Sequence, residues 1–188
     1  LDPGSPSSFT FFNHEDEVNV LNKLKAKGIH SDKNWILAAP AAASELKTWK
    51  LAGFEKVIEG LVRQRPEEII LVGGKREKEI AGPLININPE RVHNMAGETS
   101  FAELAALLSR CAFILTNDSS SMHIAYELNR PVVAIFGPTN PHKAGRLGPH
   151  WRIVREEIFC SPCDKPRCRF ERQACMEDLP PEKVLQAC

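Results

Sequence analysis

Residues 111–140 constrain the fold of this chain more than any other stretch. They contain, in order, an apolar run, a polar turn, three serines, a segment with helical spacing and a second apolar run: residues 112–115, 116–118, 119–121, 122–128 and 132–136. Short unbroken apolar runs are typical of strands that a parallel sheet buries on both faces. The stretch therefore predicts a strand, a helix and a second strand parallel to the first.

The same alternation extends over most of the chain. Strands are predicted at residues 35–39, 69–72, 91–95, 112–115, 132–136 and 151–154, and helices at 15–27, 51–65, 76–85, 101–110, 122–128 and 181–186. Strands that alternate with helices build a sheet covered on both faces. The expected class is α/β, with a doubly wound, mostly parallel, Rossmann-like sheet.

We expect three regions along the chain. Residues 1–30 form a linker and a helix that leads in, residues 31–156 form the Rossmann-like domain, and residues 157–188 form a cysteine-rich tail with a closing helix. The chain begins at Leu1 and not at Met, so we expect a fragment or a processed form.

A dense polar cluster follows the strand predicted at residues 112–115. Its members are Asp118, Ser119, Ser120, Ser121 and His123. Open α/β sheets bind ligands outside the carboxyl ends of their strands, and the free N–H groups at a helix start suit an anion such as phosphate. Helix capping by Asp118 or Ser119 is the simpler explanation. The density of the cluster favours an anion site.

Three further candidates follow neighbouring strands. Lys47 lies in the loop after the first strand, and Gly73 and Gly74 follow the second. A lysine at that edge can reach a diphosphate, although a surface lysine is ordinarily only solvated. The glycines let a ligand come close, or merely form a tight turn. The chain has neither a GxGxxG motif nor a Walker lysine pattern, so ATP-driven phosphoryl transfer has no support from the sequence.

Four of the six cysteines lie close together near the C-terminus, at Cys160, Cys163, Cys168 and Cys175. Four thiolates suit tetrahedral Zn²⁺, and they can also hold an iron–sulfur cluster or form two disulfides. Basic residues alternate with them at Lys165, Arg167, Arg169 and Arg172. These either stabilise thiolates, face phosphate or an anionic membrane surface, or are simply solvated.

Composition excludes several classes of protein. Lys plus Arg and Asp plus Glu both number 24, so the formal net charge is zero. We therefore expect no nucleic-acid partner held by bulk charge. No apolar run approaches the roughly 20 residues of a membrane-spanning helix, and the N-terminus lacks the pattern of a signal peptide.

Together these motifs resemble a known family. The resemblance runs from about Trp35 to Val184 and rests on these residues in order: Lys47 and Trp49, Val72-Gly73-Gly74, Gly97-Glu98-Thr99-Ser100, residues 116–123, Phe136-Gly137-Pro138-Thr139 and Cys175-Met176. The chain resembles the C-terminal half of the ADP-heptose:lipopolysaccharide heptosyltransferases, glycosyltransferase family nine. Two positions depart from the family pattern: Ser120 stands in place of a glycine, and Ala39-Pro40-Ala41 in place of an Asn-Pro-Gly-like or His-Pro-Gly-like turn.

The resemblance implies the GT-B fold, in which this half binds the nucleotide-sugar donor and a missing domain supplies the acceptor site and the catalytic base. By that analogy Lys47 and the backbone of Ser119, Ser120 and Ser121 contact the donor diphosphate. Asp118 accepts hydrogen bonds from the sugar or fixes the turn, His123 supports the phosphate side, and Gly73 and Gly74 lie near the nucleoside.

The family analogy also gives expectations for the whole protein. The donor is a nucleotide-diphosphate sugar such as ADP-heptose, the acceptor is the lipopolysaccharide core, and transfer needs no cofactor. The expected location is the cytoplasm, with room for peripheral contact at the inner face of the bacterial inner membrane. The isolated chain is expected to bind a nucleotide without turnover. Two alternatives stay open: a non-catalytic nucleotide- or sugar-phosphate-binding module, and a metal-dependent interaction domain built on the cysteine cluster.

Overall fold

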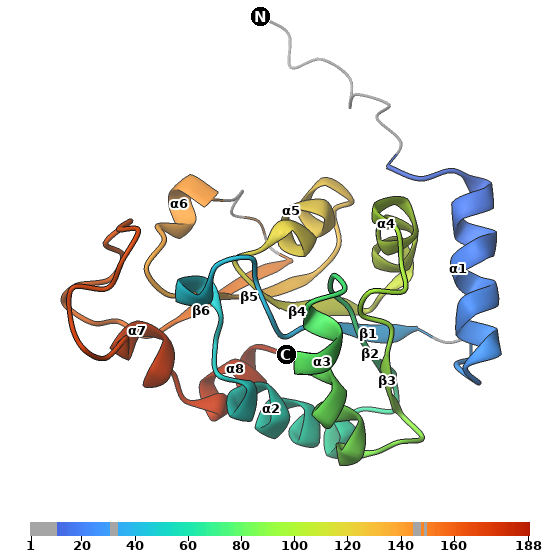
Figure 1. The fold of residues 1–188 in the computed structure, drawn as a ribbon, viewed down its shortest axis with the longest axis horizontal. Coiled ribbons are helices and arrows are strands. Elements are labelled where there is room, and N and C mark those ends of the chain that lie inside the picture. Colours follow the sequence, from blue (N-terminus) through green and yellow to red (C-terminus); the bar gives the residue numbers. More distant parts are fainter. Residues whose placement is uncertain (1–10, 31–33, 145–147, 149) are drawn as a thin grey trace, which may run out of the picture.

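A computed structural model describes residues 11–30, 34–144, 148 and 150–188. Six parallel strands form one sheet in the order β3-β2-β1-β4-β5-β6 (Figure 1). The strands are β1 Trp35–Ala39, β2 Glu68–Leu71, β3 Val92–Asn94, β4 Phe113–Asn117, β5 Val132–Phe136 and β6 Trp151–Arg155. The α/β, doubly wound prediction is confirmed. The linker predicted over residues 1–10 lies outside the described residues.

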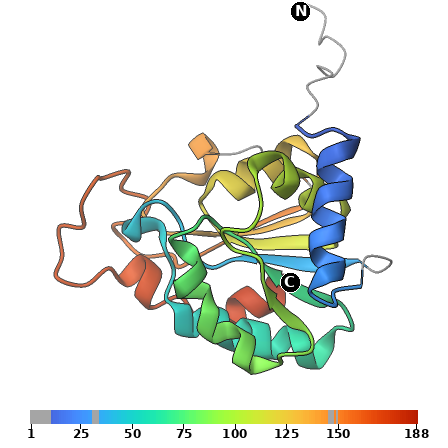
Figure 2. The same cartoon turned by 45° about the vertical axis from the view of Figure 1, so that its right-hand side comes forward.

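Helices cover both faces of the sheet (Figures 1 and 2). Their bounds are α1 His14–Ala26, α2 Leu51–Gln64, α3 Glu77–Ala81, α4 Phe101–Arg110, α5 Ser120–Glu127, α6 Pro141–Ala144, α7 Ala174–Glu177 and α8 Pro181–Ala187, with 3-10 helices η1 Glu45–Lys47 and η2 Gly82–Ile87. One face packs on α1, α4 and α5, and the other on α2 and α8. Within the described residues, no helix is both long enough and apolar enough to cross a bilayer.

Alternate residues of each central strand enter different cores, as the period of a strand requires. In β1, Leu37 packs into the core under α1 and α4, whereas Ile36 and Ala38 pack into the core under α2. All five residues of β1, β4 and β5 are buried. This two-sided burial explains why these strands appear in the sequence as unbroken apolar runs.

Local signals fix several of the helix ends. Ser100 accepts a hydrogen bond from the Glu103 N–H, and the Glu103 side chain accepts one from the Ser100 N–H, which forms the capping box expected at α4. Gly28, with φ +74°, follows α1, and the N–H of Ile29 donates to the Leu24 carbonyl in a Schellman motif. The helix predicted at residues 76–85 is shorter than expected. It ends at Ala81 and continues as the 3-10 helix η2, because Pro83 has no N–H to donate.

The strand order reverses its direction between β1 and β4. The chain adds β2 and β3 on one side of β1, and then β4, β5 and β6 on the other. The connections after β1 and β4 therefore lead to helices on opposite faces of the sheet, and the carboxyl ends of such strands are the place where open α/β sheets bind ligands.

A close contact between α2 and the loop before it gives a test of the packing. A Cβ added at Gly53 would overlap the ring of Trp49, which is fully buried. We expect Gly53→Ala to lower the free energy of unfolding by about 1–3 kcal/mol, as overpacking typically does. Gly82→Ala is the control, because no atom other than those of its chain neighbours and of the adjoining helix backbone lies within 4 Å of its Cβ position, and it should change stability by less than about 0.5 kcal/mol. Urea denaturation measures both, and equal effects would contradict this packing.

Candidate functional site

Lys47 and Asp118 meet at the reversal point of the sheet. Lys47 is the last residue of η1, in the loop after β1, and Asp118 directly follows β4. Lys47 Nζ lies 2.7 Å from Asp118 Oδ2. Only 4% of the Asp118 side chain is exposed, whereas 34% of the Lys47 side chain is exposed. The pair therefore presents a partly accessible ammonium group above a buried carboxylate.

A third loop also holds the Asp118 carboxylate. Thr139, in the loop after β5, donates its hydroxyl to Asp118 Oδ2 at 2.8 Å. The Asp118 N–H donates to the Ile135 carbonyl at 3.1 Å. The loops after β1, β4 and β5 thus converge on one carboxylate. Thr139 was not among the candidate site residues, although the sequence motif that contains it was noted.

Asn117 fixes the loop that carries Lys47. Its Oδ1 accepts a hydrogen bond from the Trp49 N–H at 3.0 Å, and its Nδ2 donates to the Ala39 carbonyl at 3.4 Å. Asn117 is fully buried, so its amide satisfies backbone groups that would otherwise be buried without partners. Asn117 was not among the predicted site residues, because nothing in the sequence shows that its partners are the end of β1 and the loop that follows it.

The three serines of the candidate cluster have different surroundings at the start of α5. Ser119 is the N-cap, yet its side chain makes no capping hydrogen bond. Its Oγ lies instead 2.8 Å from Thr116 Oγ1. Ser121 is buried and Ser120 is exposed. The first N–H groups of α5 are therefore not satisfied by the N-cap side chain and stay suited to an anion.

His123 is exposed, and its ring lies edge-on to Tyr126 with 6.3 Å between the ring centroids. Burial, and secondly the negative charge of Asp118, raise the pKa of Tyr126 to about 12. Tyr126 therefore stays neutral near pH 7. A role for His123 beside a phosphate remains a prediction.

Gly73 and Gly74 lie after β2, one strand away from the reversal point. The Gly73 carbonyl accepts a hydrogen bond from the Gly97 N–H at 2.8 Å. Gly97 has φ +76°, and a Cβ there would lie 3.0 Å from the Lys75 Cα, so a side chain is disfavoured on both counts. The turn after β2, with Gly73 and Gly74, and the turn after β3, with Gly97, thus lie side by side at the carboxyl edge of the sheet.

The cysteine-rich segment borders this site. Ser161 Oγ donates to the Gly137 carbonyl at 2.7 Å, and the N–H groups of Cys163 and Asp164 donate to the Pro138 carbonyl at 2.9 and 2.8 Å. Gln173 Nε2 donates to the carbonyl of Leu46, the residue before Lys47. The segment is therefore attached to two of the loops that hold Asp118.

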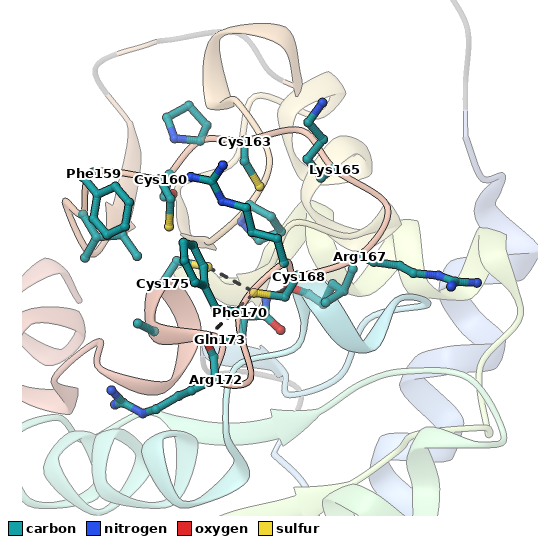
Figure 3. Close-up of a pocket in the computed structure, with 17 residues that line it drawn as sticks. Phe159, Cys160, Cys163, Lys165, Arg167, Cys168, Phe170, Arg172, Gln173 and Cys175 are labelled. Atoms are coloured by element: carbon teal, nitrogen blue, oxygen red, sulfur yellow. Dashed lines mark hydrogen bonds between the residues drawn. The ribbon is translucent and has the colours of Figure 1, made fainter.

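Cys160, Cys163, Cys168 and Cys175 lie around a single hollow of about 720 Å³ (Figure 3). All four are free thiols, and only Cys175 is buried. Burial raises the pKa of Cys175, and negative charge on the other three thiols would raise it further. Among the described residues, no three metal-ligating side chains are close enough to hold an ion as they stand. Zinc binding by these cysteines therefore stays a prediction.

The sequence of this chain is similar to those of known proteins over most of its length. Residues 12–174 match glycosyltransferase family 9 (heptosyltransferase). Lipooligosaccharide heptosyltransferase 2 of Campylobacter jejuni (serotype O:2) is 32% identical over 186 residues, which cover 92% of this chain and 56% of that protein. The chain spans about half the length of the curated relatives that it matches over most of its own residues.

Two solved structures illustrate the similarity in fold. E. coli ADP-heptose lipopolysaccharide heptosyltransferase II superposes with a TM-score of 0.73 at 24% identity, over 93% of this chain and 50% of that one. E. coli heptosyltransferase WaaC with ADP gives a TM-score of 0.66 at 22% identity, over 90% and 47%. At these sequence identities the two matches show only that this chain shares their fold.

The Lys47–Asp118 pair gives a prediction about stability. Lys47→Met leaves the buried carboxylate with Thr139 but without its counter-charge, so we expect a loss of about 1–3 kcal/mol in the free energy of unfolding. Adding Asp118→Asn should recover part of that loss, because the uncompensated charge is then removed. Lys50→Met, in the same loop, is the control and should cost less than about 0.5 kcal/mol. Urea denaturation measures the change in the free energy of unfolding for each single variant and for the double variant. If the changes for the two single variants simply add up to that of the double variant, Lys47 and Asp118 do not stabilise each other, and the prediction is wrong.

Proposed function

Because the chain belongs to glycosyltransferase family 9, the heptosyltransferase family, we propose that it is the donor-binding half of an inverting heptosyltransferase of lipopolysaccharide core synthesis. In this proposal the donor is a nucleotide-diphosphate sugar, ADP-heptose. One observation carries the proposal: Lys47 Nζ lies 2.7 Å from Asp118 Oδ2 at the reversal point of the sheet, beside the start of α5. The relative WaaC, whose structure holds ADP, supports the choice of nucleotide.

The diphosphate would bind between Lys47 and the first N–H groups of α5. The ammonium group of Lys47 is a point charge that suits phosphate oxygens, and about a third of its side chain is exposed. Asp118 holds that ammonium group in place before the donor arrives, which lowers the cost of ordering a long side chain on binding. In this proposal the backbone of Ser119, Ser120 and Ser121 contacts the phosphates, and His123 supports the phosphate side.

The other candidate residues take positions around the diphosphate. Gly73 and Gly74 lie near the nucleoside, where the absence of side chains lets the backbone approach a ligand. Asp118 fixes the turn through Thr139 and Lys47, or accepts a hydrogen bond from the sugar. Residues 31–156 form the nucleotide-sugar-binding domain in this scheme, and residues 157–188 form an appendage on its edge.

The reaction requires groups from a second domain. A base there would take the proton of an acceptor hydroxyl on the lipopolysaccharide core, and the hydroxyl oxygen would attack the anomeric carbon of the donor. The bond from that carbon to the nucleoside diphosphate would break, and the leaving group would gain negative charge. Lys47 and the N-terminus of α5 would stabilise that charge where it develops. Transfer on this route needs no metal or other cofactor, and the reaction would take place in the cytoplasm, at or near the inner membrane.

Ser120 is compatible with this proposal. It is the first residue of α5 and is exposed. Among the described residues other than glycine, only Asn129 and Asp164 have positive φ. The backbone at Ser120 therefore does not require glycine, and its side chain has room in solvent. We expect Ser120→Gly to change ADP affinity by no more than about twofold, which is within the usual effect of a surface substitution.

Titration calorimetry with ADP and with ADP-heptose tests the proposal. We expect the chain to bind both, and Lys47→Met to weaken ADP binding roughly 10- to 100-fold, the worth of a hydrogen bond to a charged group. Lys50→Met is the matched control, since Lys50 Nζ donates to the Glu177 carbonyl at the surface, and it should bind ADP like the unaltered chain. Absence of binding by both ligands would overturn the proposal.

An activity assay separates donor binding from catalysis. The 188 residues alone should release no ADP from ADP-heptose in the presence of acceptor, because the proposed base is not among them. Adding the complementary half of the protein should restore transfer. Turnover by the 188 residues alone would show that the base lies within this chain, and the division of labour proposed above would be wrong.

A further inference from the structure

The segment between β6 and α7 exposes two phenylalanine rings. Residues 156–173 contain no helix or strand, and every residue from 162 to 172 is exposed. Phe159 is 88% exposed, the largest value for any bulky apolar side chain among the described residues, and Phe170 is 43% exposed. Figure 2 shows this part of the chain projecting from the body of the domain. Connections this long without regular structure are uncommon in compact domains and usually have a function.

The two rings form one exposed cluster. Their centroids are 5.8 Å apart, and the rings meet edge to face. The Arg169 guanidinium lies 4.9 Å from the centroid of Phe170, which is within the range of a cation–π contact. Single exposed apolar side chains are ordinary on a protein surface, whereas apolar side chains that gather there indicate an interaction site. The pair of rings therefore needs a partner that accepts both apolar and cationic groups.

Positive charge surrounds the rings. The described residues that line the hollow of Figure 3 include both rings, four basic side chains and no acidic one. Lys165, Arg167 and Arg169 are three of these basic residues. All three are exposed, and none of them makes an ion pair with another residue that the structure describes. They are therefore available to a negatively charged partner.

The fourth basic residue and one nearby carboxylate are already paired. Arg172 pairs with Glu177 and Asp178, and Asp164 pairs with Lys143 at 2.7 Å. The acidic residues at positions 157 and 171 are exposed but do not line the hollow. The surface around the rings therefore keeps an excess of positive charge, although the whole chain has a formal net charge of zero.

Hydrogen bonds hold this segment beside the proposed donor site. Ser161 Oγ donates to the Gly137 carbonyl at 2.7 Å, and Arg155 Nη2 donates to the Ser161 carbonyl at 2.6 Å. At the other end of the segment, Gln173 Nε2 donates to the carbonyl of Leu46, the residue before Lys47. The rings and the cations are thus presented by a segment whose two ends are attached to the loops after β5 and β1.

We propose that the rings of Phe159 and Phe170, with the three cations beside them, form a surface that docks on an anionic lipid bilayer. Aromatic side chains settle at the level of the lipid headgroups, and each Lys or Arg beside an anionic leaflet adds roughly fivefold to binding. Lasting attachment takes an apolar and a basic signal together, and this surface has both. A bilayer requires no shape complementarity, so it accepts an irregular loop, whereas a folded partner binds through a fitted surface.

Membrane docking of this segment deepens the function proposed above and rests on it. The proposed acceptor is part of a lipopolysaccharide, which is itself a membrane lipid. A domain docked through this segment would hold the loop of Lys47, and with it the donor, close to the bilayer that carries the acceptor. No part of the segment has to move, because the rings and the cations are already exposed.

Co-sedimentation of the 188-residue chain with lipid vesicles tests the docking surface. We expect binding to vesicles of phosphatidylglycerol and phosphatidylcholine in equal parts, and no measurable binding to vesicles of phosphatidylcholine alone. Added salt should weaken the binding, because exposed charges are screened. Phe159→Ser should weaken it roughly tenfold. Lys165→Gln combined with Arg167→Gln should weaken it roughly 25-fold, about fivefold for each charge.

Two variants that change the same types of residue elsewhere are the matched controls. Phe101→Ser removes another exposed phenylalanine, at the start of α4. Lys56→Gln combined with Arg63→Gln removes two exposed cations from α2, outside the hollow. Both controls should bind the anionic vesicles like the unaltered chain. All the substituted side chains are exposed, so circular dichroism should show that every variant remains folded.

Absence of binding to the anionic vesicles, equal binding to both kinds of vesicle, or equal losses in the test and control variants would each overturn the proposal. A dimer of the chain that Phe159→Ser converts to a monomer, with vesicle binding unchanged, would overturn it too, because the surface would then belong to a second copy. ADP calorimetry on Phe159→Ser is an independent readout and should match the unaltered chain. Failure of the docking surface and failure of the donor site can therefore be told apart.

Discussion

The Asp118 carboxylate is almost wholly removed from water, and the loops at the carboxyl edge of the sheet are arranged around it. A buried carboxylate is costly unless charged and polar partners surround it. Lys47 and Thr139 provide these partners from the loops after β1 and β5. Asp118 itself is held by the backbone of Ile135. A single electrostatic requirement therefore fixes three loops that are far apart in the sequence.

The position of that carboxylate follows from the topology. Parallel strands in the order β3-β2-β1-β4-β5-β6 place the ends of β1 and β4 side by side while their connections leave on opposite faces. Asn117 then ties the backbone of Trp49 and Ala39 to β4. The ion pair thus lies between loops that are anchored to the two central strands, which gives a binding site a rigid base.

Much of the fold could be predicted from the sequence, because burial on both faces leaves a local pattern. The apolar runs that became β1, β4 and β5 are unbroken, and the capping box at Ser100 and Glu103 marks the start of α4. Short elements were not predictable in this way. The helices α6 and α7 have four residues each, too few to show a helical period. The change to a 3-10 helix after Ala81 depends on how Pro83 is accommodated.

The candidate site was predictable only in part. The start of α5, which suits an anion, and Lys47 after β1 could be predicted from the sequence. Both depend only on residue type and on the position of a strand end, which are local features. Asn117 and Thr139 were not selected, because their importance lies in hydrogen bonds to partners 68 and 21 residues away. The four cysteines are obvious in the sequence, but their shared hollow and their attachment to the turn at Gly137 are visible only in the folded chain.

We propose that a nucleotide diphosphate binds at the reversal point of the sheet. Titration of the ¹⁵N-labelled chain with ADP, followed by amide chemical shifts in NMR spectra, tests it most directly. We expect saturable shifts concentrated at Ser119, Ser120, Ser121 and Met122 and in the loop around Lys47. Shifts confined to the cysteine-rich segment, or no saturable shifts at the start of α5, would contradict it.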